Sequence, residues 1–184
     1  RDYYASRGLG DVYKRQLLPR SNALKTKAIR YFQTDRTLTR IVSPPLNKAE
    51  ADLLLSELKI YINRISGNRI LEEKIDFGII SPYKAQVQYL RNKIKADASL
   101  KPYRSLFTVN TVDGFQGQER DVIFISLVRA NEEGQIGFLN DLRRMNVAIT
   151  RARMKLVILG EAETLKHHGF YRKLLEFIQN IGNQ

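Results

Sequence analysis

The 184-residue sequence contains no cysteine and no tryptophan, and its only two histidines are the adjacent His167 and His168. The absence of cysteine excludes disulfides and thiolate metal sites, and so few histidines argue against a multi-ligand metal site or a histidine-based triad. The longest apolar runs, such as 122–125 and 156–159, fall far short of the roughly 20 residues that span a bilayer. The N-terminus also lacks the apolar segment of a secretory signal. We therefore expect a cytoplasmic protein, of the bacterial cytosolic type, without a metal site or a membrane partner.

Positive charge is what the sequence has in excess. It holds 31 lysines and arginines against 19 acidic residues, a formal net charge of +12, and residues 17–40 carry Asp35 as their single acid. The basic residues of that segment are Arg20, Lys25, Lys27, Arg30, Arg36 and Arg40. A chain this basic favours a polyanionic partner such as nucleic acid. A solvated basic face is the alternative for 17–40, and charge alone does not separate DNA from RNA.

From residue 40 onward, short β-branched runs alternate with longer helical patterns. Strands are predicted at 77–80, 106–109, 122–128 and 156–160, with a weaker candidate at 41–42. Helices are predicted from Asn47 to about Gly67, from Tyr83 to about Ala98, from Leu139 to Arg151 and from Phe170 to Ile181. This order predicts an α/β fold with a mainly parallel sheet and helices on both faces, in which ligands bind beyond the carboxyl ends of the strands.

Two local patterns indicate where helices begin. Asn47 and Glu50 have the spacing of a capping box, in which each side chain bonds the backbone amide of the other residue. Ser81 followed by Pro82 has the pattern of a cap and a proline at the first helical position.

Two polar segments could carry chemistry. The first, TVNTVDGFQGQE at 108–119, connects two predicted strands and could present backbone N–H groups and short side chains to a phosphate or a ribose. A polar turn connection is the alternative. The second, DLRRMNVAITRAR at 141–153, places Arg144 and Arg151 seven residues apart on a common side of a helix. Their guanidinium groups suit bidentate phosphate contact, and a solvated basic face is the alternative.

The segments TVDGFQGQERDVIFISLVRAN and FLNDLRRMNVAITRAR resemble motifs V and VI of superfamily 1 helicases. The resembling branch includes the nonsense-mediated-decay RNA helicase, senataxin and the nuclease-helicase of Okazaki-fragment processing. GIISPYKAQVQYL and LNKAEADLL resemble further segments of that branch, so the likeness covers residues 40–175 approximately. It implies the second, C-terminal RecA-like domain of an ATP-dependent DNA or RNA helicase, with a P-loop NTPase type of fold. Such helicases bind ATP between two RecA-like domains, and single-stranded nucleic acid crosses both.

The resemblance also implies roles for individual residues. Arg151 is expected to be the arginine finger that reaches the γ-phosphate, with Gln116 and Glu119 as further catalytic residues that couple nucleotide to nucleic acid. Contacts to ATP are expected at Gly117, Glu119, Arg144 and Arg151. Contacts to nucleic acid are expected at Ser81, Pro82, Tyr83, Thr108, Asn110, Thr111 and Arg129.

Parts of the helicase machinery are missing from the sequence. It contains no G-x-x-x-x-G-K-[ST] loop, no acidic Mg²⁺ pair after a strand, and no tyrosine-arginine segment of the kind that opens this domain in the family. We therefore expect a first RecA-like domain of the parent protein to bind most of the ATP and Mg²⁺, and the chain alone not to hydrolyse ATP. A nucleic-acid-binding module from a parent that has lost its ATPase activity is the alternative. The presence of Arg151 and Glu119 favours the helicase.

The first sixteen residues, RDYYASRGLGDVYKRQ, resemble nothing in these helicases. Residues 6–16 resemble the in-frame translation of a transposase-based sequencing adapter, with an index barcode at 3–5. We expect 1–16 to be a foreign, disordered segment, and 17–184 to be a helicase domain truncated at its N-terminus by library preparation. A natural disordered arm is the alternative. Residues 1–16 hold four basic and two acidic residues, which leaves +10 for the rest of the chain.

Overall fold

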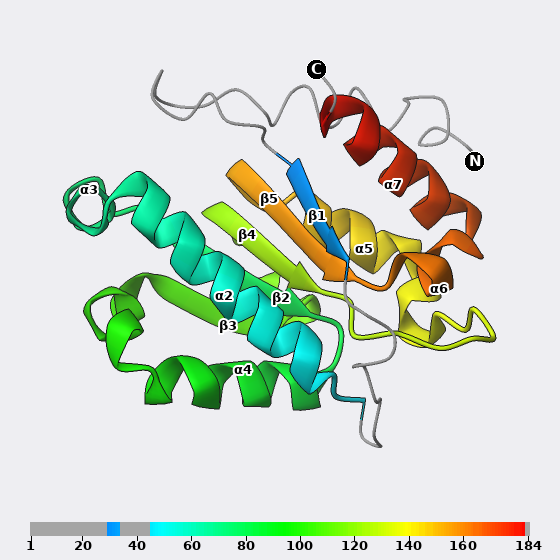
Figure 1. Cartoon of the computed structure of the whole chain (residues 1–184), viewed down its shortest axis with the longest axis horizontal. Helices are drawn as coiled ribbons and strands as arrows, with labels where there is room; N and C mark the ends of the chain where they lie inside the picture. The colour runs from blue at the N-terminus through cyan, green and yellow to red at the C-terminus, as the bar shows by residue number, and fades with distance from the viewer. Residues whose placement is uncertain (1–28, 34–44, 183–184) are drawn as a thin grey trace.

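A parallel five-stranded sheet organises the computed structural model, which describes residues 29–33 and 45–182 (Figure 1). The strands are β1 (Ile29–Gln33), β2 (Phe77–Ser81), β3 (Phe107–Thr111), β4 (Arg120–Ser126) and β5 (Ala152–Gly160). They lie in the order β1-β5-β4-β2-β3, and every neighbouring pair is parallel. The predicted parallel sheet is confirmed.

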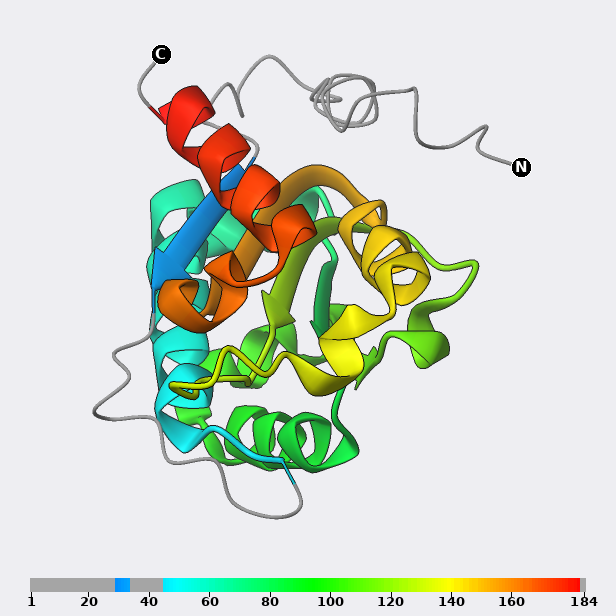
Figure 2. The same cartoon turned by 90° about the vertical axis from the view of Figure 1, so that its right-hand side faces the viewer.

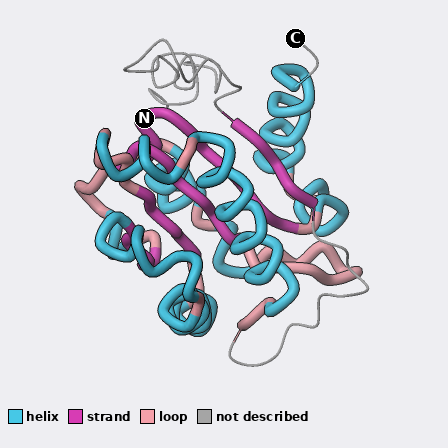
Figure 3. Tube along the Cα trace, turned by 60° about the vertical axis from the view of Figure 1, so that its left-hand side comes forward, coloured by secondary structure: helices cyan, strands magenta, loops and turns pink. Residues whose placement is uncertain are grey.

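Helices cover both faces of this sheet. The α-helices are α2 (Lys48–Ile65), α3 (Gly67–Glu72), α4 (Lys84–Ala96), α5 (Leu142–Ile149), α6 (Ala162–Lys166) and α7 (Gly169–Gly182). Short 3₁₀ segments are η3 (Ala98–Leu106), η4 (Asp113–Phe115) and η5 (Gly137–Asn140). Helices α2 and α4 pack on one face, and α5 and α7 on the other (Figures 1 and 2). Figure 3 shows the strands in magenta lying between these helical layers.

The central strands are apolar at nearly every position because both faces of the sheet are covered. In β4, Val122 and Phe124 belong to the core under α2 and α4, whereas Ile123 and Ile125 belong to the core under α5 and α7. All four side chains are fully buried. Successive side chains of a strand point to opposite faces, so a strand covered on both sides needs an apolar residue at each step.

Two predicted helix boundaries are wrong. Gly67 does not end α2; Ser66 takes the left-handed conformation there, with a φ of 80°, and Gly67 begins α3. Pro82 does not lie in the first turn of α4, which begins at Lys84. The reason is that β2 continues through Ser81, which pairs with Thr111 of β3, so the chain needs two more residues to turn from strand to helix.

Other boundaries differ by a few residues. The helix predicted at 139–151 is shorter, because η5 and a one-residue break precede α5. Strand β5 begins four residues earlier than predicted, and β1 was not expected as a strand. Residues 1–16 and the weak strand candidate at 41–42 lie outside the described residues, as do all the basic residues of 17–40 except Arg30. Within 29–33 and 45–182, no helix is both long and apolar enough to span a membrane.

The double-sided core predicts a large effect of truncating Phe124. Phe124→Ala removes a fully buried ring from the centre of the sheet, and we expect it to lower the free energy of unfolding by roughly 3–5 kcal/mol. Leu71→Ala is the matched control, because Leu71 is 43% exposed on α3 and its truncation should have little effect. Urea denaturation of both variants measures the difference; similar midpoints would contradict the core described here.

Candidate functional site

The predicted site residues divide between two opposite edges of the sheet. Because all the strands are parallel, their carboxyl ends form one edge and their amino ends form the other. Tyr83 and Arg129 follow the carboxyl ends of β2 and β4, whereas Glu119 and Arg151 directly precede the amino ends of β4 and β5. The rule that ligands bind at carboxyl ends therefore accounts only for the first group.

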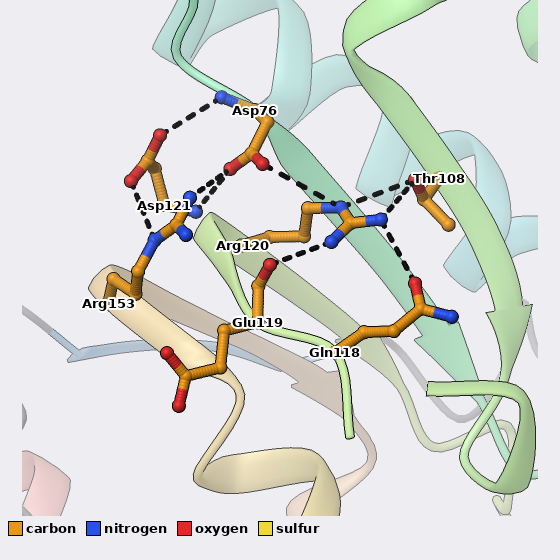
Figure 4. A network of polar contacts seen from close by, with 7 residues as sticks. All are labelled: Asp76, Thr108, Gln118, Glu119, Arg120, Asp121 and Arg153. Atoms are coloured by element: carbon orange, nitrogen blue, oxygen red, sulfur yellow. Dashed lines mark hydrogen bonds and ion pairs between the residues drawn. The ribbon is translucent and has the colours of Figure 1, made fainter. Parts of the chain in front are cut away.

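At the amino edge, the pairing of β4 with β5 places Glu119 next to Arg151. Arg120 pairs with Ala152, and the Arg120 amide donates a hydrogen bond of 3.0 Å to the Arg151 carbonyl. The exposed Glu119 carboxylate turns away from the polar contacts of Arg120 (Figure 4). A carboxylate and a guanidinium thus stand on neighbouring chain segments at the same edge.

The Arg151 side chain closes the end of α5. Its Nε donates to the Val147 carbonyl at 3.0 Å and its Nη2 to the Thr150 hydroxyl at 3.2 Å. The first bond satisfies a carbonyl that the end of a helix leaves without a partner. These bonds engage two of the five N–H donors of a guanidinium. The other donors fit phosphate oxygens, so the cation can contact an anion while it still holds its own helix.

The loop that leads to Glu119 contains a glycine with a specific conformational role. Gly117 has a φ of 76°, in the left-handed region that favours glycine. A Cβ there would meet no atom within 4 Å, so the backbone conformation and not crowding selects glycine. Gln116 beside it is exposed. The backbone of this loop is open to the close approach of a ligand.

A network of ion pairs fixes the amino ends of β2, β4 and β5 (Figure 4). Arg153 donates to Asp121 at 3.0 Å and to Asp76 at 2.9 Å. The carboxylate of Asp76 accepts the Asp121 amide at 2.6 Å, and the carboxylate of Asp121 accepts the Asp76 amide at 3.2 Å. Three strand ends are thereby tied together at the edge where Glu119 and Arg151 precede β4 and β5.

Arg120 connects the same edge to β3. Its Nη2 donates to the Thr108 hydroxyl at 3.0 Å and to Gln118 Oε1 at 3.0 Å, and its Nη1 donates to the Glu119 carbonyl at 2.7 Å. Thr108 therefore lies near the amino end of β3, held by Arg120, whereas Asn110 and Thr111 lie at the carboxyl end of the same strand.

At the carboxyl edge, Tyr83 and Arg129 contact each other. Arg129 Nε donates to the Tyr83 hydroxyl at 2.8 Å, and the guanidinium carbon lies 5.4 Å from the centre of the tyrosine ring. Both residues are partly exposed, as is Pro82. Ser81 is fully buried, and its hydroxyl accepts the Tyr83 amide at 3.4 Å. Ser81 therefore shapes the turn and does not itself face solvent.

Asn110 and Thr111 form the turn at the carboxyl end of β3. Asn110 Oδ1 accepts the Thr111 amide at 2.9 Å, and the Thr111 hydroxyl accepts the Gly114 amide at 3.4 Å. A Cβ on Gly114 would overlap the Asn110 side chain. Because Thr111 pairs with Ser81, this turn lies beside the one that carries Tyr83.

Arg144 lies near the other end of α5 from Arg151. As the third residue of that helix it bonds Asp113 at 3.1 Å and Asp141 at 3.5 Å, and its guanidinium carbon lies 4.4 Å from the centre of the Phe138 ring. Seven residues at 1.5 Å per residue separate it from Arg151 by about 10 Å along the axis. The structure thus separates Arg144 from Arg151 along α5 and ties it to Asp113, at the start of the loop that leads to Gly117 and Glu119.

The capping box predicted at the start of α2 forms only in part. Asn47 Oδ1 accepts the Glu50 amide at 3.0 Å as expected, but the Asn47 amide donates to Gln86 and not to Glu50. The Glu50 carboxylate instead crosses to β4. Its Oε1 accepts the Ser126 hydroxyl at 2.6 Å and the Val128 amide at 2.8 Å. Glu50 bonds these donors and not the Asn47 amide, because the fold places the Ser126 hydroxyl and the Val128 amide next to its buried carboxylate.

Glu50 and Asn47 together hold Val128 in an unusual conformation. Val128 has a φ of 72°, which is strained for a β-branched residue. Its amide donates to Glu50, and its carbonyl accepts from Asn47 Nδ2 at 3.1 Å. We call these contacts of Glu50 and Asn47 with Val128 the Glu50 clamp. Arg129 follows Val128 directly, so the clamp sets the direction from which Arg129 reaches Tyr83. The sequence indicated Asn47 and Glu50 only as a capping box, and Val128 only as the last residue of a predicted strand.

Burial perturbs the charge of this clamp. Desolvation raises the pKa of Glu50 to about 7, against the opposing effect of its bonds from Ser126 and the backbone of Val128 and Leu127. The other carboxyl oxygen, Oε2, has no hydrogen-bond partner within the described part of the chain.

The parallel sheet with helices on both of its faces defines an α/β domain. The sequence profile of the AAA domain family matches residues 13–163, and the chain belongs to that family. The match begins within the segment 1–16 that resembles an adapter.

Several curated relatives of the chain are named as helicases. It is 39% identical over 138 residues, 75% of its length, to DNA polymerase alpha-associated DNA helicase A of Saccharomyces cerevisiae. It is 43% identical over 119 residues, 65% of its length, to Probable helicase MAGATAMA 3 of Arabidopsis thaliana. Over 102 residues, 54% of its length, it is 45% identical to the Regulator of nonsense transcripts 1 homolog of Neurospora crassa.

The helicase family expected from the motifs is confirmed. The chain spans only 19%, 14% and 9% of the lengths of these three relatives, in the same order. Among solved structures, the C-terminal domain of a possible DNA helicase from Lactobacillus plantarum aligns with 90% of this chain and 94% of its own, at 14% identity and a TM-score of 0.46. The fold assignment rests on the sheet described above.

The raised pKa of Glu50 predicts a pH-dependent stability. The folded chain binds the Glu50 proton more tightly than the unfolded chain, whose ordinary value is 4.5, so the free energy of unfolding falls as pH rises from about 4.5 to about 7. Glu50→Gln cannot titrate. Between pH 5 and pH 8, the free energy of unfolding of the wild type should therefore fall relative to this variant by roughly 2–3 kcal/mol.

Urea denaturation at several pH values measures this difference. Glu72→Gln is the control, because Glu72 is an exposed acid on α3 and its substitution should leave the pH dependence unchanged. Parallel pH profiles for wild type and Glu50→Gln would show that the carboxyl group titrates normally.

Proposed function

We propose that this chain is the second RecA-like domain of an ATP-dependent helicase, and that it supplies an arginine finger and part of a single-stranded nucleic-acid track. One observation carries the proposal. The same sheet presents Glu119 and Arg151 at its amino edge and Tyr83 and Arg129 at its carboxyl edge. Two ligands could therefore bind the domain at once. The names of the curated relatives support helicase activity for a longer protein that contains this domain.

In this proposal the amino edge faces the nucleotide. ATP supplies the phosphoryl group, and together with Mg²⁺ it is held mostly by the first RecA-like domain. The Arg151 guanidinium offsets the negative charge that develops on the transferred phosphoryl group. Glu119 accepts a hydrogen bond from the ribose, and the open backbone at Gly117 permits close approach. Because the first domain binds most of the nucleotide, this chain alone is expected not to hydrolyse ATP.

The carboxyl edge faces the nucleic acid. Arg129 has further N–H donors beyond the one bonded to Tyr83, and these suit the phosphate oxygens of a DNA or RNA strand. Thr111 and Asn110 add short polar groups at the neighbouring turn. Ser81 contributes indirectly, because it fixes the turn that carries Tyr83.

The finger role predicts a kinetic defect in a longer chain that joins this domain to its nucleotide-binding partner domain. Arg151→Ala should lower the ATPase kcat by roughly 10³- to 10⁵-fold, because the phosphoryl transition state loses its compensating charge. Binding of single-stranded nucleic acid without nucleotide should change little. Arg64→Ala is the control, since Arg64 is exposed in the last turn of α2. Near-normal turnover in Arg151→Ala would remove the finger assignment and favour a pure nucleic-acid-binding module.

The nucleic-acid role is testable with the present chain. Arg129→Ala should weaken binding of a fluorescein-labelled oligothymidine about tenfold, because one charged hydrogen bond to phosphate is lost. The slope of log affinity against log salt should also fall by about 0.7. Fluorescence anisotropy at several salt concentrations measures both quantities. Arg64→Ala removes the same charge at a distant position. An equal loss of affinity in that variant would show that the effect of Arg129→Ala comes from net charge and not from a specific phosphate contact.

A further inference from the structure

Phe138 is exposed although the apolar residues that flank it in the chain are buried. It lies in η5 with 44% of its surface accessible, more than any other large hydrophobic side chain between residues 45 and 180. Ile136 and Leu139 on either side are buried in the core under α5 and α7. The Leu139 carbonyl also accepts a hydrogen bond of 2.7 Å from the buried Tyr171 hydroxyl. The core thus fixes the backbone of η5 and holds the Phe138 ring at the surface.

Phe138 belongs to a continuous row of aromatic and guanidinium groups. The row runs from Arg129 through Tyr83 and Phe138 to Arg144, and we call these four residues the stacking row. The Tyr83 and Phe138 ring centres are 6.2 Å apart, and the Arg144 guanidinium carbon lies 4.4 Å from the Phe138 ring centre. Each member therefore restricts the next, and the row is preorganised at the carboxyl edge.

The two arginines of the stacking row have different charge environments. Asp113 and Asp141 both pair with Arg144, so its charge is compensated and its planar group serves chiefly to support the Phe138 ring. No ion pair of Arg129 with a carboxylate occurs among the described residues, and its Nε bonds the neutral Tyr83 hydroxyl. A phosphate is therefore expected to bind at the Arg129 end of the row, and an uncharged planar group at the Phe138 end.

We propose that Phe138 is a base-stacking residue, whose exposed ring receives an unpaired nucleobase of the single strand that Arg129 contacts through phosphate. The inference rests on the proposed function and adds a base contact to a phosphate contact. A nucleobase fits both demands of the row, because a nucleotide joins a flat aromatic group to an anion on one short unit. Stacking on an aromatic side chain tolerates every base, since each base has a π-face. The Phe138 contact therefore strengthens binding without selecting a sequence.

A tryptophan at this position tests the contact directly, because the chain contains no tryptophan. Phe138→Trp should bind oligothymidine as the wild type does, and its fluorescence should be quenched as the base stacks on the indole. An abasic oligomer of the same length should leave the fluorescence unchanged. Leu71→Trp is the control, because Leu71 is 43% exposed on α3. Equal quenching in both variants, or by both oligomers, would overturn the proposal.

Affinity gives an independent readout. Phe138→Ala should weaken binding of oligothymidine about tenfold and leave binding of the abasic oligomer unchanged. Phe138→Leu should remain weak, and Phe138→Tyr should restore binding, because the aromatic face and not apolar bulk is required. Equal losses for both oligomers would overturn the base contact and point to a structural role or a protein-binding surface.

The binding measurements distinguish a failure of the base contact from a failure of the proposed nucleic-acid edge. If Arg129→Ala weakens binding but Phe138→Ala and Phe138→Trp do not respond to the base, the stacking contact alone is wrong. If the wild-type chain binds neither oligomer, the proposed nucleic-acid edge is wrong, and the base contact is overturned with it.

Discussion

The parallel pairing of β4 with β5 is the constraint on which the rest of the structure depends. It sets Arg120 opposite Ala152, and so it brings together the two loops that end at Glu119 and Arg151. Those loops are about 30 residues apart in the chain, and no local interaction would join them. Since both strands are buried on both faces, the register between them is fixed by two cores at once.

Parallel strands also determine how the chain connects the two edges of the sheet. A connection between parallel strands must return from the carboxyl edge to the amino edge, and both 112–119 and 142–151 do so. Arg144 and Asp113 tie these two connections together near the carboxyl edge, and the bond from the Arg120 amide to the Arg151 carbonyl ties them at the amino edge. Asn110 and Thr111 therefore lie at the start of the first connection, and Glu119 lies at its end beside Arg151.

The Glu50 clamp at the carboxyl edge contains two features that are unfavourable for stability. A carboxylate is removed from water, with its pKa raised to about 7, and a valine adopts a left-handed backbone. The same arrangement aims Arg129 at Tyr83. Unfavourable local features that persist in a well-packed domain are more common where a side chain must be held for a ligand. Stability and placement of the site are therefore coupled through Asn47, Glu50 and Val128.

The sequence by itself determined the α/β order, the buried strands and the motif segments, because apolar periodicity and motif spacing are local properties of the chain. It also indicated Asn47 as a helix cap, which formed as expected. Only the tertiary structure decided that Glu50 bonds β4, that Thr108 bonds Arg120 and Arg144 pairs with Asp113 and Asp141, and that Phe138 stays exposed in the stacking row. Those outcomes depend on partners distant in sequence, whose positions are set by strand order and core packing and cannot be read from local spacing.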